Sequence, residues 1–278
     1  VEKGIPTGLR AGETLDIYYA AFRVPDLIFI WSASMVSLSV MIPFLSRKRE
    51  ESKEAARLFL DSVFSAFFVF MILVSALAFF FAPKLAHLLF PGFSAETLLS
   101  TIFLMRIMLL QPIFLGISNL LASVTQLERR FFVYALSPIL YNLGIILGIF
   151  FLYPAMVLQV LAWGVVLGAL LHLGIQVPVI IRTGMLPRLR FPFDISRLKE
   201  VLLISLPRTF TLSLQNITVL ILTALGSLLG AGSIAVFNFS WNLQSVPLSI
   251  VGASYSLAAF PTLAGLWTKG EKGIFIGT

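Results

Sequence analysis

Long apolar runs separated by short polar loops make up most of this sequence. The runs extend for roughly 20 to 30 residues without the strict alternation of polar and apolar positions that marks a barrel strand. Only helices or closed barrels satisfy their backbone hydrogen bonds inside a bilayer. The pattern therefore predicts an all-α polytopic membrane protein. Its seven expected transmembrane spans are residues 15–45, 58–82, 97–122, 132–152, 156–181, 200–225 and 233–266.

The first span differs from the others because it carries three charges near its start, on Asp16, Arg23 and Asp26. Seven residues make about two helical turns, so Asp16 and Arg23 lie on nearly the same face. Asp26 lies on the adjoining face. Charged side chains within a bilayer face the interior of a bundle or a water-filled cavity. We therefore expect the remaining spans to form a wall around this polar face, and we expect a local kink at Pro25.

Composition and loop charge support this class. Hydrophobic residues make up 58% of the chain and charged residues 12%, against about 25% charged residues in soluble domains. There is no cysteine, so disulfides are excluded. The net charge of +7 does not indicate nucleic-acid binding, because 14 of the 20 basic residues lie in every second loop, which is typical of membrane topology. The loops expected on the cytoplasmic side are 46–57, 126–131, 182–199 and 268–278.

A weak internal repeat suggests how the spans are grouped. Gly8 and Gly12 correspond to Gly226 and Gly230, and residues 42–46 correspond to 260–264. Both matches flank an unusually long span, and the two spans cross in the same direction. This favours parallel repeats with a substrate path between them. The expected division is a remnant at 1–13, an N-terminal helical repeat at 14–190 and the start of a C-terminal repeat at 191–278, which predicts that the chain is a fragment.

Catalytic and metal-binding motifs are absent from the sequence. The two histidines, His87 and His172, lie in different regions, and no HExxH, GxSxG, Walker or GxGxxG pattern occurs. We expect no enzyme activity, no cofactor and no metal site, and we expect His172 to be a packing residue. The spacing of Gly144 with Gly148, and of Gly164 with Gly168, predicts close helix packing. Residues 83–94 are expected to form a separate segment at the membrane interface.

Intramembrane polar residues remain as the candidates for a site. A polar interior shared by the first span and the last two spans would accommodate them, and Asn238 is also on the last span. The alternative for Arg23 is a structural role in which Asp16 and Asp26 neutralise its charge. The predicted substrate-binding residues are Arg23, Asp16, Asp26, Arg208, Gln215, Asn216, Asn242 and Gln244.

At these residues the chain resembles the MurJ/MviN family. Residues 15–26, LDIYYAAFRVPD, are similar to that family's second-helix signature, roughly T-D-A-F-F-x-A-F-[RK]-[LIV]-P-N. Further similarities follow in the same order along nearly the whole chain. They lie at Arg130-Phe131, Pro138, Leu140 and Asn142, at Gln176, Pro178 and 184–188, and at Pro207, Ser213, Gln215 and 229–233.

The resemblance implies a lipid II flippase of the multidrug/oligosaccharidyl-lipid/polysaccharide exporter superfamily. Such a protein carries the undecaprenyl-linked peptidoglycan precursor across the bacterial cytoplasmic membrane by alternating access. The resemblance does not specify whether a coupling ion or the membrane potential drives this transport. The expected partners are membrane lipid, the lipid-linked saccharide and the remaining transporter helices, with no nucleic acid. The family has fourteen helices, of which this chain resembles the second to the eighth.

The chain departs from the family pattern at three places. Phe29-Ile30 stands where the family has paired arginines, Trp31-Ser32-Ala33-Ser34 stands in place of Phe-Ala-Glu-Gly, and Asn242 replaces an arginine. In the family these arginines are thought to bind the pyrophosphate of the lipid carrier. Two alternatives therefore stay open, namely another exporter of the superfamily, for polysaccharide lipids or for drugs and cations, and a non-transporting membrane scaffold. A membrane-embedded glycosyltransferase would need an acidic pair in an outward loop, where the sequence has essentially only Glu96.

Overall fold

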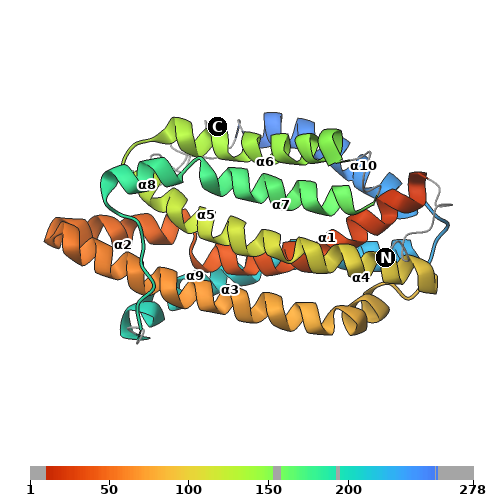
Figure 1. Cartoon of the computed structure of the whole chain (residues 1–278), viewed down its shortest axis with the longest axis horizontal. Coiled ribbons are helices and arrows are strands. Elements are labelled where there is room, and N and C mark those ends of the chain that lie inside the picture. The colour runs from red at the N-terminus through yellow and green to blue at the C-terminus, as the bar shows by residue number, and fades with distance from the viewer. Residues whose placement is uncertain (1–10, 153–157, 192–194, 254, 256–278) are drawn as a thin grey trace, which may run out of the picture.

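The computed structural model describes residues 11–152, 158–191, 195–253 and 255, and these residues form helices and connecting turns with no strand (Figure 1). The prediction of an all-helical fold is therefore confirmed. The helices are α1 (Ala11–Met35), α2 (Leu38–Glu51), α3 (Lys53–Leu89), α4 (Ala95–Met108), α5 (Leu110–Leu127), α6 (Phe131–Leu152), α7 (Gln159–Gly174), α8 (Val177–Thr183), α9 (Ile195–Ser227), α10 (Ser233–Pro247) and the π-helix η1 (Leu248–Ala253).

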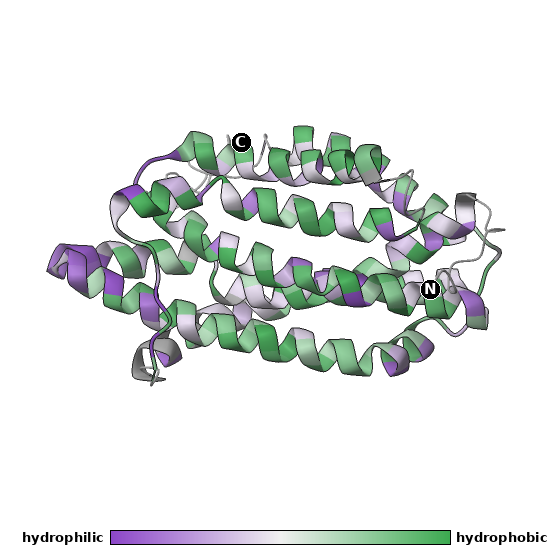
Figure 2. Ribbon diagram, viewed as in Figure 1, coloured by the Kyte–Doolittle hydropathy of each residue, from purple (hydrophilic) through white to green (hydrophobic). Residues whose placement is uncertain are grey.

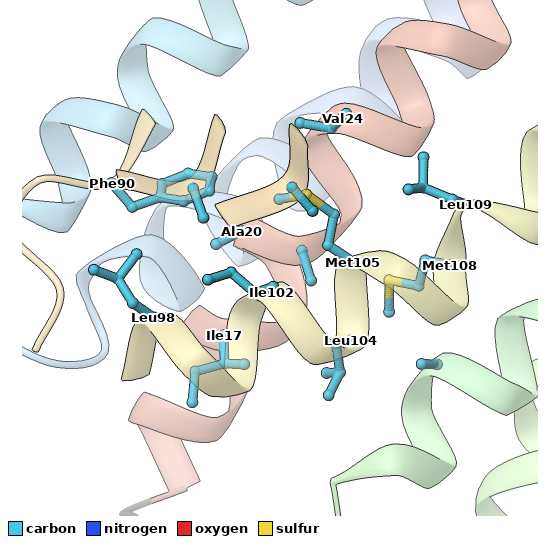
Figure 3. Close-up of a cluster of buried hydrophobic side chains, with 14 of the residues drawn as sticks. Ile17, Ala20, Val24, Phe90, Leu98, Ile102, Leu104, Met105, Met108 and Leu109 are labelled. Carbon is cyan, nitrogen blue, oxygen red and sulfur yellow. The ribbon is translucent and has the colours of Figure 1, made fainter. Parts of the chain in front are cut away.

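Helix α1 lies at the centre of the bundle, as its charges predicted. It contacts α3, α4, α5, α9 and α10. One face, formed by Ile17, Ala20 and Val24, is buried against the apolar side chains of α4, including Ile102 and Met105 (Figure 3). This spacing of three and four residues is the apolar stripe of a helix. The charged face, with Asp16 and Arg23, is turned toward α10.

The predicted first span is divided into two helices. Helix α1 continues through Pro25, and the chain leaves the helical conformation at Val36 and Ser37 before α2 begins. The hydroxyls of Ser32 and Ser34 donate to the carbonyl oxygens of Phe29 and Trp31, three residues earlier. Such bonds compete with the regular helical pattern. The serine-rich stretch therefore precedes a break that the sequence analysis did not predict, since it expected one span with a local kink at Pro25.

Five helical stretches are long and apolar enough to cross a membrane within the described residues. They are Lys53–Leu89, Ala95–Leu127, Phe131–Phe151, Gln159–Thr183 and Thr209–Ser227. They correspond to the second to sixth predicted spans. The other two predicted spans are α1 with α2, whose helix α1 is the charged one, and α10 with η1, beyond which residues 256–278 lie outside the described part. For these two, crossing the membrane stays a prediction.

The predicted interfacial segment was wrong. Residues 83–89 do not form a separate segment, because α3 continues through Pro83 to Leu89. The span at 156–181 is interrupted at Ile175 and Gln176, between α7 and α8. A buried network bridges this interruption to α5. In it, Ser118 Oγ lies 2.7 Å from His172 Nδ1, and Gln176 Nε2 donates to the Ser118 carbonyl oxygen. His172 is thus a packing residue, as predicted.

The glycine spacings on α6 and α7 produce the expected close packing. A Cβ placed on Gly144 would overlap the Gly168 backbone, and one on Gly148 would overlap the Gly164 backbone. The order of these contacts shows that α6 and α7 run antiparallel. Small residues at such crossings let two backbones approach within a membrane.

Gly168→Ala is expected to lower the unfolding temperature clearly. Its new Cβ would overlap the Tyr141 carbonyl oxygen, which belongs to a helix backbone and cannot rotate away. Overpacking of this kind costs typically about 1–3 kcal/mol. Thermal unfolding followed by circular dichroism in detergent measures the effect. Gly174→Ala is the matched control, since nothing lies within 4 Å of its Cβ position. Equal unfolding temperatures for the two variants would contradict the α6–α7 packing.

Polar residues are concentrated at the ends of the bundle, whereas the middle of α3 is apolar (Figure 2). One end contains the α2–α3 tip, the α5–α6 turn and the segment after α8, and we call it the basic end. Its basic residues are Arg47, Lys48, Arg49, Lys53, Arg57, Arg129, Arg130, Arg182, Arg188 and Arg190. The other end contains the start of α1, the α3–α4 turn and the α9–α10 turn, and we call it the glycine end, after Gly12, Gly92, Gly230 and Gly232.

Candidate functional site at the contact of α1 with α10

The N-terminus of α10 is held by a carboxylate from α1. Asp16 is buried, and its two oxygens accept hydrogen bonds from the backbone N–H groups of Gly232 at 2.6 Å and Ala235 at 2.7 Å. Gly232 precedes the helix with a φ of 94°, a left-handed conformation that favours glycine. The first N–H groups of a helix lack partners within it and attract negative charge. Asp16 therefore supplies a capping carboxylate to the N-terminus of a helix more than 200 residues away.

Close backbone contacts seal the glycine end around this cap. A Cβ on Gly12 would lie 3.1 Å from Gly232 Cα, and one on Gly92 would overlap the backbone of Ser227. A pocket of about 200 Å³ remains beside the cap, between α1, α4 and the α9–α10 turn. On its wall Thr97 Oγ1 donates to Glu13 at 3.0 Å. The glycine end is thus closed between α1 and the α9–α10 turn.

Two turns deeper, Arg23 joins α1 to α10 a second time. Its Nη2 donates to Asn238 Oδ1 at 2.6 Å, and the side chain is half-buried. Asp16 pairs with residues 232 and 235 while Arg23 pairs with residue 238, so α1 and α10 run side by side in the same direction. This is the relation that the repeat predicted for these two stretches. Arg23 Nε is buried and has no hydrogen-bond partner within the described residues.

Asp26 and Gln111 continue this polar region toward α5. Asp26 is half-buried and interacts electrostatically with Arg23, and the Gln111 side chain lies beside it. Gln111 is only 2% exposed, and its Oε1 has no partner in the part of the chain that the structure describes. The region contains one guanidinium, one carboxylate and two amides. No group of three or more His, Cys, Asp or Glu side chains suitable for a metal ion occurs among the described residues.

Comparison with known proteins identifies the family. The family model described as "Lipid II flippase MurJ" matches residues 6–275, nearly the whole chain. The chain belongs to the MurJ family. The probable lipid II flippase MurJ of Buchnera aphidicola subsp. Acyrthosiphon pisum is 29% identical over 264 residues, which are 92% of this chain and 51% of that protein. The lipid II flippase MurJ of Burkholderia cenocepacia is 24% identical over 269 residues, 94% of this chain and 52% of that protein.

A solved structure agrees with this fold. It is described as lipid II flippase MurJ in an inward closed conformation, and it matches with a TM-score of 0.76 at 23% identity, over 93% of this chain and 53% of that one. The chain therefore spans about half the length of the MurJ proteins that it matches. The prediction of a multi-pass membrane protein of this family is confirmed.

The structure brings together only part of the predicted site. Asp16, Arg23 and Asp26 lie along α1, but the Asp16 carboxylate binds the α10 backbone. The amide residues predicted on the later helices do not line a buried polar interior with α1. Gln215, Asn242 and Gln244 are exposed and Asn216 is half-buried, while Arg208 lies on α9 with its side chain outside the described part. Whether these residues contact a substrate stays a prediction in this MurJ family member.

Asn238 is the residue that the predicted set omitted. Sequence analysis noted it on the last span but selected Asn242 and Gln244. Arg23 lies seven residues after Asp16, and Asn238 lies six residues after Gly232, so the two have nearly equal depth in parallel helices. This equal spacing points to Asn238 only once Asp16 is known to cap α10. The local sequence does not reveal that long-range contact. Gln111 carries no comparable signal, since it lies in the first turn of α5, within an otherwise apolar stretch.

Proposed function

We propose that this chain acts in lipid II translocation, carrying an undecaprenyl-linked peptidoglycan precursor across the bacterial cytoplasmic membrane. Membership of a family described as a lipid II flippase supports this, and so does the bundle of apolar helices. The proposed activity is transport of a lipid-linked saccharide, and transport requires no catalytic group. The basic end faces the cytoplasm, because basic loops remain on that side of a membrane.

The observation that supports the proposal most directly is the incomplete hydrogen bonding of the Arg23 guanidinium. This guanidinium is held at the contact of α1 with α10 by a neutral amide, Asn238, and one of its N–H groups is unpartnered. A half-buried guanidinium with a free donor suits a phosphate oxygen, since arginine presents its donors as a rigid fork. The pyrophosphate of the lipid carrier supplies such oxygens. Asp26 limits the net charge, so that the site is stable when no substrate is bound.

The closure at the glycine end supports alternating access. Asp16 and the glycine contacts hold α1 against the α9–α10 turn, and passage of a head group toward that side requires these contacts to separate. Cap hydrogen bonds suit this purpose because water can replace them when the end opens.

A second candidate is flipping of a different lipid-linked saccharide by the same mechanism. The specific observation in its favour is the set of departures at Phe29-Ile30 and Asn242, where the family resemblance implies arginines. Fewer guanidinium groups favour a head group with fewer phosphate charges.

Expression of this chain together with the remaining transporter helices, in a bacterium depleted of its own lipid II flippase, tests the proposal. Growth should be restored, and lipid II should become accessible to a cleaving enzyme added outside spheroplasts. Arg23→Ala is the matched negative control. Restored growth without outward lipid II would favour the second candidate. Failure of this wild-type assembly in both assays, although it is present in the membrane at normal abundance, would contradict the proposal.

The proposed orientation predicts a labelling pattern. Single cysteines can be placed in this chain, which has none of its own. Leu229→Cys at the glycine end should react with an impermeant thiol reagent in intact cells, and Glu50→Cys at the basic end should react only after permeabilisation. Both positions are exposed, so accessibility within the fold does not decide the outcome. Labelling of position 50 in intact cells would reverse the assignment.

A further inference from the structure

An extended segment at the basic end is pinned along α3 by its backbone. Residues 184–191 connect α8 toward α9, and two buried α3 side chains one turn apart hold them. Asp61 Oδ1 accepts from the Arg188 N–H at 2.8 Å, and Ser65 Oγ accepts from the Arg190 N–H at 2.7 Å. Ser65 Oγ also lies 3.2 Å from the Arg188 carbonyl oxygen. These bonds position the backbone and leave the two arginine side chains free to bind something else.

The side chains of Arg188 and Arg190 line one open pocket with Arg57. Alternate residues of an extended segment share a face, and both arginines are exposed at this pocket. The pocket has a volume of about 240 Å³. Three arginines, with the acidic residues Glu54 and Asp61, thus line a space that can hold a phosphate group with part of its substituent. The lining residues are Glu54, Arg57, Leu58, Asp61, Arg188, Leu189 and Arg190.

The pocket is surrounded by exposed apolar side chains and by a helix apolar enough to cross a membrane, as expected at a membrane surface. Exposed apolar side chains alternate with the arginines, with Leu189 54% and Phe191 63% exposed. Arg57 and Asp61 lie on α3, a helix apolar enough to span the membrane. Basic pockets between transmembrane helices at the cytoplasmic side bind lipid head groups. The apolar residues suit acyl chains, and the guanidinium groups suit phosphate.

We propose that this pocket, formed by Arg57, Arg188 and Arg190, binds the phosphate of an anionic phospholipid in the leaflet at the basic end. The site is separate from the contact of α1 with α10, since it is built from α3 and the segment before α9. It does not depend on which lipid-linked saccharide the chain translocates. The ligand is a phosphodiester on a membrane lipid, and free phosphate is the alternative source of the same chemistry.

Native mass spectrometry of the purified chain, titrated with phosphatidylglycerol or phosphatidylcholine, tests the proposal. Phosphatidylglycerol should be retained preferentially. Arg188→Gln with Arg190→Gln should weaken that binding roughly 30-fold, from about fivefold for each basic residue at a charged surface. The backbone bonds to Asp61 and Ser65 do not involve the replaced side chains. Arg129→Gln with Arg130→Gln removes the same charge from exposed positions elsewhere on the basic end and should leave binding unchanged.

Several results would overturn the assignment. An equal loss in both double variants would mean general attraction to charge, and unchanged binding in the Arg188/Arg190 variant would exclude the pocket. Displacement of phosphatidylglycerol by inorganic phosphate at matched concentration would assign the pocket to free phosphate. If the Arg188/Arg190 variant unfolds at a lower temperature than wild type, Arg57→Gln provides the same test, because it leaves residues 184–191 unaltered.

Discussion

Asp16→Ala is expected to lower the free energy of unfolding by about 3 kcal/mol and to open the glycine end. The substitution removes two hydrogen bonds from a charged acceptor, each contributing about 1.5–3 kcal/mol, and leaves the N–H groups of Gly232 and Ala235 without partners. Asp16→Asn should have a smaller effect, since its amide oxygen can replace one of the two acceptors. Thermal unfolding followed by tryptophan fluorescence measures the loss, because the chain has four tryptophans.

A labelling experiment separates opening of this end from general destabilisation. Ser227 is 3% exposed at the glycine end, and Ser123 is fully buried on α5. A cysteine at position 227 should react faster with a thiol reagent in the Asp16→Ala background, whereas one at position 123 should stay unreactive. Glu13→Gln is the matched control, because its amide oxygen can still accept from Thr97. Equal acceleration at both positions would show that Asp16 stabilises the whole bundle and has no particular role in closing this end.

Arg23→Ala is expected to reduce translocation by a factor of about 100 or more while leaving abundance in the membrane near normal. The guanidinium is the group proposed to hold phosphate oxygens, and charge-assisted hydrogen bonds are worth about 1.5–3 kcal/mol each. Two such bonds correspond to this factor at about 1.4 kcal/mol per tenfold change. Arg23→Lys should retain part of the activity, since lysine keeps the charge and loses the fork. Translocation into the outer leaflet of reconstituted vesicles gives the rate directly.

Two further variants distinguish substrate binding from charge neutralisation. Asn238→Ala removes the partner on α10 and leaves the guanidinium in place, so translocation should fall less than in Arg23→Ala. If Arg23 serves only to neutralise Asp26, then Arg23→Leu combined with Asp26→Leu removes both charges and should restore abundance and transport. Full translocation by this double variant would refute the role of Arg23 in substrate binding.

Much of the fold could be predicted because it depends on local physics. A bilayer accepts apolar helices and excludes irregular backbone, so the lengths of the apolar runs determine where the helices lie. The glycine spacing on α6 and α7 was sufficient to predict close helix packing there, since only the absence of a side chain permits that approach. The three charges on the first span predicted its central position, because a buried charge needs polar neighbours. Each of these inferences needed only residues close together in sequence.

The site depended on tertiary contacts that no local pattern specifies. Asp16 was expected to balance Arg23 on the same helix face, but the N-terminus of α10 offers unpaired N–H groups that bind a carboxylate more favourably. That choice left Arg23 to pair with Asn238. Similarly, nothing in the sequence near Asp61 and Ser65 indicates that they anchor Arg188 and Arg190 more than 120 residues later. Sequence by itself thus determined the helices and their polar faces, and the packing of distant helix ends decided which polar groups meet, because hydrogen bonds require contact within about 3 Å.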